Sequence, residues 1–403
     1  MMLRLNADDA RRTILHLQAL TRPQNRRLTS TELHDLIEAL GFVQIDSIQW
    51  VERAHHMILH ARNQTYRPQD LHRLTEREQL LFENWTHDAS FIPSSFYPYW
   101  KHKFRREEAR LHDKFHDWQG AGFVAHLDDL MRRIEQDGAL MSRDLERPAG
   151  KQEMWQWHDG KAALEYLWRI GRLSIRERRN FQKVYDLPER CLGSAPLDDS
   201  VDHEAFIDWA CRQALDRLGF GSPADIARFF DLVTIDEAKQ WLDRQDGQSV
   251  RAVIVAGADR SEKALFARPD IEDVRDGLPA LPDKARFLSP FDPVIRDRKR
   301  LLWLWGFDYK IEIYVPEKKR RFGYYIFPIL DGTKLVGRID MRADRKADAL
   351  VVRRIWLEKG VKLSAGRRQR FETELARLTR FCGLSETVWD GSVEAGRSEI
   401  QGG

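Results

Sequence analysis

Two polar side chains stand in a short apolar segment, Phe42–Ile48, and their spacing suits hydrolytic chemistry. Gln44 and Asp46 are two residues apart, so in a β-strand their side chains share one face, roughly 6.5 Å apart along the backbone. On a helix the pair would diverge by roughly 200°. An amide beside a carboxylate can position and polarise a water molecule. The alternative, which composition alone favours, is a solvent-facing edge strand with an ordinary Gln and Asp.

The residues before this segment predict the elements that position it. Thr29 and Glu32 have the spacing of a capping box, an apolar helical pattern follows, and Gly41 fits the position just after a helix. Residues 8–20 also predict a helix, and an arginine-bearing loop over 21–28 joins the two. This order is typical of the start of a helix-turn-helix unit.

The same order of elements recurs along the chain. Residues 68–117 have a helical pattern with aromatic interruptions. Further helices are predicted over 121–137, 160–170, 202–218, 223–230 and 234–245, and strand pairs within 173–185 and over 251–255 with 263–267. Because a helix-turn-helix followed by a basic hairpin is the layout of a winged helix, we predict three tandem winged-helix modules, over 1–117, 118–195 and 196–277.

The periodicity changes after a proline-rich stretch, Leu278–Pro293, which marks a domain boundary. Strands are predicted over 310–315, 321–330, 334–341 and 350–357, with a tight turn at Asp331-Gly332. A helix over 364–381 follows. We therefore predict an α+β chain whose last domain covers 278–390, with a disordered polar tail over 391–403.

The composition is that of a globular, intracellular protein. Of 403 residues, 42% are hydrophobic and 32% charged, and no apolar run approaches the roughly 18 residues of a membrane span. The N-terminus lacks a secretory apolar region, and the three cysteines lie far apart, so we expect a cytoplasmic, nucleoid-associated protein without disulfides. The net charge of +3 is small, but arginines cluster and 13 tryptophans are present, which suits binding surfaces.

Basic residues gather at three places that could grip a nucleic-acid backbone: directly after the Gln44–Asp46 motif, on the hairpin within 173–185, and in the segment 289–300. For the segment 289–300 the alternative is an ordinary exposed loop. The candidate DNA-binding residues are Arg53, His55, His56, Arg176, Arg178, Arg296, Arg298, Lys299 and Arg300.

Other chemistries have weaker support. His56 and His60 have the spacing of a two-histidine metal site, but no glutamate follows the first histidine and no third ligand is evident. The chain contains no Walker loop, no G-x-G-x-x-G and no G-x-S-x-G motif. We therefore predict neither a metal nor a nucleotide cofactor.

Taken together, several motifs resemble the YcaQ-like winged-helix DNA glycosylases, which are related to AlkZ and also called AlkX. These motifs are VQIDSI with ERAHH, ENWTHDASFIP, SPFDPVIRDRKR with LWGFDYKIEIYVP, and FGYYIFPILDGTKLVGRID. The resemblance runs from about residue 5 to about residue 385. It implies three winged-helix modules and a small β-barrel-like domain around a DNA channel, followed by the C-terminal helix.

The resemblance also implies an activity. Members of the family excise N7- and N3-alkylated purines from double-stranded DNA and unhook interstrand crosslinks. The family signature of Gln, an apolar residue, then Gln or Asp is present here as Gln44-Ile45-Asp46, and the Asp form implies broader crosslink substrates. Asp46 would stabilise an oxocarbenium-like sugar and take a proton from water that Gln44 orients, in a monofunctional enzyme that we expect to be a monomer.

Two other functions are compatible with the same residues. A transcriptional regulator could use tandem winged helices to bind DNA without chemistry, which would leave Gln44 and Asp46 dispensable. A metal-dependent nuclease could use His56, His60 and nearby acids, and its activity would be sensitive to chelators.

Overall fold

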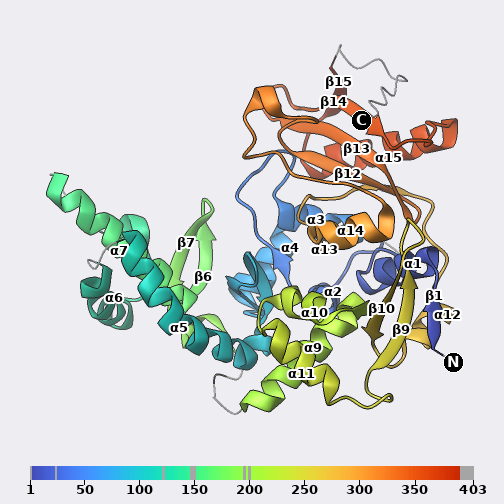
Figure 1. Ribbon diagram of the computed structural model, residues 1–403. Helices are drawn as coiled ribbons and strands as arrows, with labels where there is room; N and C mark the ends of the chain where they lie inside the picture. Colours follow the sequence, from blue (N-terminus) through green and yellow to red (C-terminus); the bar gives the residue numbers. More distant parts are fainter. Residues whose placement is uncertain are drawn as a thin grey trace.

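The computed structural model describes residues 2–22, 25–119, 123–145, 151–193, 197 and 201–390. Within these residues, helices are mixed with four β-sheets, which confirms the α+β class. Figure 1 shows an arm of helices and one hairpin, coloured teal to green, that projects from a body holding the N- and C-terminal parts. The predicted disordered tail lies outside the described residues. None of the described helices is long and apolar enough to cross a membrane.

The Gln44–Asp46 motif adjoins a small antiparallel sheet. Helix α2 (Ser30–Leu40) begins with the predicted capping box and ends at Gly41, whose φ of +85° suits glycine. Strand β2 (Val43–Gln44) pairs with β4 (Ala89–Pro93), which pairs on its other side with β3 (Leu81–Trp85). Helix α3 (Ala54–Arg62) follows the motif.

Two predictions for this region need correction. The strand predicted over 42–48 is only two residues long, because its partner β4 begins at Ala89. The last backbone bond of the pair runs from the Ile45 amide to the Ala89 carbonyl, at 2.8 Å. The helical pattern predicted over 68–117 is interrupted by the β3–β4 hairpin, whose aromatic side chains pack as strand residues. The helical parts of the segment are α4 (Pro68–His72), the π-helix η1 (Arg73–Arg77), the 3₁₀-helix η2 (Ser94–Phe96) and α5 (Tyr97–Gln119).

The projecting arm holds the second sheet, in which the order of strands is β5-β7-β6. Its elements are α6 (Val124–Asp137), β5 (Leu140–Met141), the 3₁₀-helix η4 (Ser142–Asp144), α7 (Lys151–Arg169), β6 (Ser174–Arg179), β7 (Gln182–Asp186) and α8 (Pro188–Cys191). Helix α7 does not begin at Gly160, as predicted, but starts earlier and continues through this residue. A Cβ at Gly160 would come within 3.0 Å of Leu145, so the glycine permits close packing there instead of marking a helix start.

The third sheet has the strand order β1-β9-β10-β8. Strand β1 pairs in parallel with β9, and the following helix α1 packs on α9, so the N-terminus joins residues more than 200 positions away. The helices predicted over 223–230 and 234–245 are present, and they begin with capping boxes at Ser222 and Thr234. The elements are β1 (Leu3–Leu5), α1 (Ala7–Leu17), α9 (His203–Leu218), β8 (Phe220–Gly221), α10 (Pro223–Phe230), α11 (Ile235–Asp243), β9 (Arg251–Ala256), β10 (Glu262–Ala267) and α12 (Ile271–Asp276).

The C-terminal sheet has the order β11-β12-β13-β14-β15, with β11 and β15 at its two edges. A barrel-like closure therefore stays a prediction. The strand predicted over 310–315 does not form, because the Glu312 carboxylate accepts bonds from three backbone amides of 321–323 and folds the segment into a loop. The elements are β11 (Ala285–Phe287), α13 (Pro293–Arg296), α14 (Arg298–Trp305), the 3₁₀-helix η5 (Glu317–Lys319), β12 (Ile326–Asp331), β13 (Lys334–Asp344), β14 (Ala349–Leu357), α15 (Ala365–Phe381) and β15 (Glu386–Trp389).

Candidate active site

Gln44 is held at the end of β2 with only 4% of its surface exposed. Its side-chain Nε2 donates a hydrogen bond to Asp88 Oδ2 at 3.1 Å. Its Oε1 is buried and has no hydrogen-bond partner among the residues that the structure describes. A buried acceptor without a partner costs free energy, so the Gln44 carbonyl oxygen is available to accept one more hydrogen bond.

Asp46 is half-buried in the loop after β2. The hydroxyl of Tyr325, just before β12, donates to Asp46 Oδ2 at 3.2 Å. Burial raises the pKa of Asp46, while bonds from the backbone at Ile48 and Ser47 and from Tyr325, and the charge of Arg53, partly offset that increase. Burial thus makes Asp46 a stronger base than an exposed aspartate.

A second carboxylate, Asp88, lies in the same cluster and comes from the turn between β3 and β4. Its backbone carbonyl accepts bonds from the Thr86 amide and from the hydroxyls of Thr86 and Ser90, at 3.0 to 3.1 Å, which fixes the turn. Burial raises the pKa of Asp88, and the nearby Asp46 carboxylate raises it further. Gln44, Asp46 and Asp88 therefore form one polar site built from two segments.

Three of the predicted DNA-binding residues meet around Phe181, at the tip of the β6–β7 hairpin. The guanidinium groups of Arg53 and Arg178 lie 4.2 and 4.6 Å from the centre of its ring, and the His55 ring is nearly parallel to it, 6.1 Å away. Arg178 also pairs with Glu83 at 2.7 Å. A cavity of about 320 Å³ lies here, between α3, α4, η1, β3 and the hairpin.

Other predicted residues lie apart from this group. Arg176 is on the same hairpin, half-exposed, and faces Asp186 at 3.3 Å. His56 is buried and bonded to the Tyr66 hydroxyl at 2.7 Å, and His60 stacks on Phe381 at 4.1 Å. Burial lowers the pKa of each of these two histidines to about 3, so both are uncharged at neutral pH. Among the described residues, no group of three or more His, Cys, Asp or Glu side chains is arranged to hold a metal.

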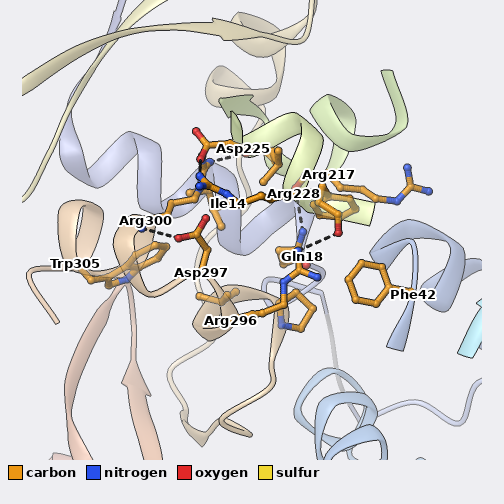
Figure 2. Close-up of a pocket in the computed structure, with 14 residues that line it drawn as sticks. Ile14, Gln18, Phe42, Arg217, Asp225, Arg228, Arg296, Asp297, Arg300 and Trp305 are labelled. Carbon is orange, nitrogen blue, oxygen red and sulfur yellow. Dashed lines mark hydrogen bonds and ion pairs between the residues drawn. The ribbon is translucent and has the colours of Figure 1, made fainter. Parts of the chain in front are cut away.

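Most of the basic run 296–300 is engaged in packing between elements. Arg296 donates to His87 Nδ1 at 2.9 Å and to the Phe229 carbonyl at 3.0 Å, Arg298 donates to the carbonyls of residues 290 and 295, and Arg300 donates to that of residue 218. Figure 2 shows Arg296 and Arg300 beside a cavity of about 40 Å³, with Phe42 near Arg296. Lys299 is exposed.

The sequence did not identify Asp88, His87 or Tyr325 as site residues. Asp88 and His87 lie within the ENWTHDASFIP motif, where apolar alternation on both sides of Thr-His-Asp could have predicted a hairpin turn. The approach of Tyr325 to Asp46 joins residues 279 positions apart. No local pattern encodes such a contact.

The cluster of an amide and two carboxylates is a site suited to activating water, which is what a hydrolase needs. The family described as "DNA glycosylase AlkZ-like" matches residues 37–381, and the chain belongs to this family. It is therefore a DNA glycosylase, a hydrolase that acts on damaged DNA in DNA repair. The solved structure of Streptomyces sahachiroi DNA glycosylase AlkZ matches with a TM-score of 0.65 at 15% identity, covering 96% of this chain and 100% of that one, and so has the same fold.

Proposed function

We propose that the protein is a monofunctional glycosylase that hydrolyses the N-glycosidic bond of N7- and N3-alkylated purines in double-stranded DNA. We extend the proposal to unhooking of interstrand crosslinks. The observation that carries it is the cluster of Gln44, Asp46 and Asp88, in which one amide oxygen is buried without a partner and one carboxylate is a strengthened base.

The chemistry follows from the charge of the lesion. An N7-alkylguanine is cationic, so when the bond from N9 to the sugar C1′ breaks, the electron pair stays on the base, which leaves neutral. No general acid is needed. Water attacks C1′ of the oxocarbenium-like sugar, its proton passes to Asp46, and an abasic sugar forms. The Asp46 carboxylate also stabilises the positive charge on the sugar.

The remaining predictions fit this proposal. We infer that the three sheet-containing regions over 1–117, 118–195 and 196–277 are winged-helix modules, and that 278–390 forms a barrel-like domain beside them. We propose that exposed basic residues, Lys299 among them, contact the DNA backbone, and that Arg53 and Arg178 help to hold the β6–β7 hairpin near the site. We also propose that the protein acts as a monomer at the nucleoid.

The proposal is tested with a duplex that holds one 7-methylguanine. Incubation with the protein should leave an alkali-labile site that gives a strand break, and an undamaged duplex should stay intact. The activity should persist in a chelator. Asp46→Asn should remove it, whereas Ser47→Ala, which changes an exposed neighbour, should keep it. Binding without any base release by the unaltered protein would leave only a non-catalytic DNA binder, and chelator-sensitive strand cleavage would indicate a nuclease.

A further inference from the structure

The orientation of the Gln44 amide is decided by its neighbour. A carboxylate only accepts hydrogen bonds, so the group of Gln44 that faces Asp88 must be the amide NH₂. The carbonyl oxygen then lies on the other branch of the amide, where it is buried and unpartnered. Without Asp88, the two ends of the amide could exchange places by a rotation about the last side-chain bond.

His87 and Arg296 lie next to Asp88. Arg296 can only donate, so at 2.9 Å it makes Nδ1 of His87 an acceptor. Burial, together with the charges of Arg296 and Lys103, lowers the pKa of His87 to about 3, and the ring is therefore neutral with its proton on Nε2. That Nε2 lies 3.6 Å from Asp88 Oδ2. The neutral imidazole of His87 therefore lies between the charged Arg296 guanidinium and the Asp88 carboxylate.

We propose that Asp88 is a positioning residue for the hydrolysis, holding Gln44 so that the amide carbonyl accepts a hydrogen bond from the attacking water. This inference rests on the proposed function. Asp88 itself does not touch the reacting atoms and acts through Gln44. Three bonds to the Asp88 carbonyl hold the turn that carries this side chain, and His87 and Arg296 lie beside its carboxylate.

Asp88 also acts on Asp46 through its charge. The Asp46 carboxylate raises the pKa of Asp88, and because repulsion between two carboxylates acts equally on both, loss of the Asp88 charge should favour the ionised form of Asp46. Removal of the Asp88 charge should therefore move the acid limb of the rate profile to lower pH. A residue with a merely structural role would leave that limb unmoved.

The test compares single-turnover rates for release of 7-methylguanine by Asp88→Ala and Asp88→Asn. Asp88→Ala should lower the rate by about tenfold at unchanged DNA affinity, since one orienting hydrogen bond is lost. Asp88→Asn keeps an acceptor for Gln44, so it should recover most of the rate, with its acid limb at lower pH. Asp35→Asn, an exposed carboxylate on α2, is the matched control.

A double-mutant cycle separates positioning from structure. At a pH above the acid limb, where Asp46 is ionised in every variant, Asp88→Ala should change the rate of a Gln44→Ala protein by less than about twofold, because the positioning effect passes through Gln44. The inference would be overturned if the rate effects of Gln44→Ala and Asp88→Ala multiplied in the double variant, or if the acid limb of Asp88→Asn did not move. Either result would leave glycosylase activity established. Failure of the unaltered protein to release 7-methylguanine would instead overturn the proposed function. Thermal melting of each variant shows whether a rate loss reflects unfolding.

Discussion

At the scale of single residues, the strength of Asp46 as a base depends on two opposing influences. Burial raises its pKa, and the Tyr325 hydroxyl, which stabilises the ionised carboxylate, lowers it. The general base must be deprotonated to act, so the rate should rise with pH through the pKa of Asp46. Anything that removes the hydroxyl should move this rise to higher pH.

Tyr325→Phe tests this balance. The acid limb of the variant should lie at higher pH than that of the unaltered protein, and the rate loss should be largest at low pH. Tyr309→Phe is the control, because the Tyr309 hydroxyl bonds to the Ile326 carbonyl and not to Asp46. The measurement is the rate of 7-methylguanine release across pH. A shift in both variants, or in neither, would contradict the role given to Tyr325.

The residues of the site were only partly predictable. Gln44 and Asp46 could be identified because alternation in a short strand brings residues two apart to one face, and because a family motif coincides with them. The predicted strand placed the two side chains on one face, but no pattern in the sequence indicated that Gln44 is buried and bonded to Asp88. Contacts such as those of Tyr325 and Arg296 depend on tertiary packing, which residue types and spacing do not specify.

At the scale of elements, helix α3 lies directly after the Gln44–Asp46 motif and buries three histidines. His55, His56 and His60 are all buried on this short helix, and burial lowers the pKa of each. In the unfolded chain their pKa values return to about 6.5. The unfolded state therefore binds more protons than the folded state once the pH falls below 6.5, and acidification favours unfolding.

We expect the free energy of unfolding to fall between pH 6.5 and pH 5 by about 1.4 kcal/mol per pH unit for each of these histidines. Chemical denaturation monitored by tryptophan fluorescence at several pH values measures it. His60→Gln cannot take up the proton, so its stability should fall less steeply, whatever its stability at pH 7. If the free energy of unfolding of this variant fell with pH as steeply as that of the unaltered protein, buried His60 would not be a source of the pH dependence.

The loop between α14 and β12 presents a different element. Tyr314 is 91% exposed, and Lys318, Lys319 and Arg321 near it are exposed as well. The loop leads directly to Tyr325 at the site. An exposed aromatic ring on a basic loop suits stacking on a nucleobase.

We expect Tyr314→Ala to weaken binding to a duplex with 7-methylguanine by about tenfold, in line with the loss of one base-stacking contact. Tyr314→Phe keeps the ring and should bind nearly as tightly as the unaltered protein. Fluorescence anisotropy with a labelled duplex gives both affinities. Equal loss in the two variants would assign the effect to the hydroxyl, and no loss in either would place the loop away from the DNA.

Elements with strong local signals were predicted well. The capping box predicted at Thr29 is present, the helices predicted over 223–230 and 234–245 are present, and the β6–β7 hairpin lies where the sequence indicated. The β3–β4 hairpin was missed because its aromatic residues also fit a helical pattern. The run predicted as a strand over 310–315 is instead a loop that the Glu312 carboxylate holds.

At the scale of the whole molecule, binding to DNA should depend on released counterions. The affinity for an undamaged duplex should fall by about tenfold or more between 50 and 200 mM salt. Lys299→Ala should reduce the slope of log affinity against log salt by about 1, the effect of one lost phosphate contact. A slope that is flat, or unchanged by this substitution, would contradict a backbone contact at Lys299.

The arrangement of modules could not be read from local patterns. Strand β1 pairs with β9, and Tyr325 from the C-terminal sheet reaches the motif near residue 46. The first contact joins the N-terminus to the third sheet, and the second brings the C-terminal sheet to the Gln44–Asp46 motif.

The central claim is that the Asp46 carboxylate drives hydrolysis and is not needed for binding. The most direct measurement is the single-turnover rate of 7-methylguanine release at saturating protein, for the unaltered chain and for Asp46→Asn. We predict a rate lower by about 10²- to 10⁴-fold in the variant, with the dissociation constant for the duplex changed by less than about threefold. A variant that releases the base as fast as the unaltered protein, or that loses binding and rate in equal measure, would contradict the account.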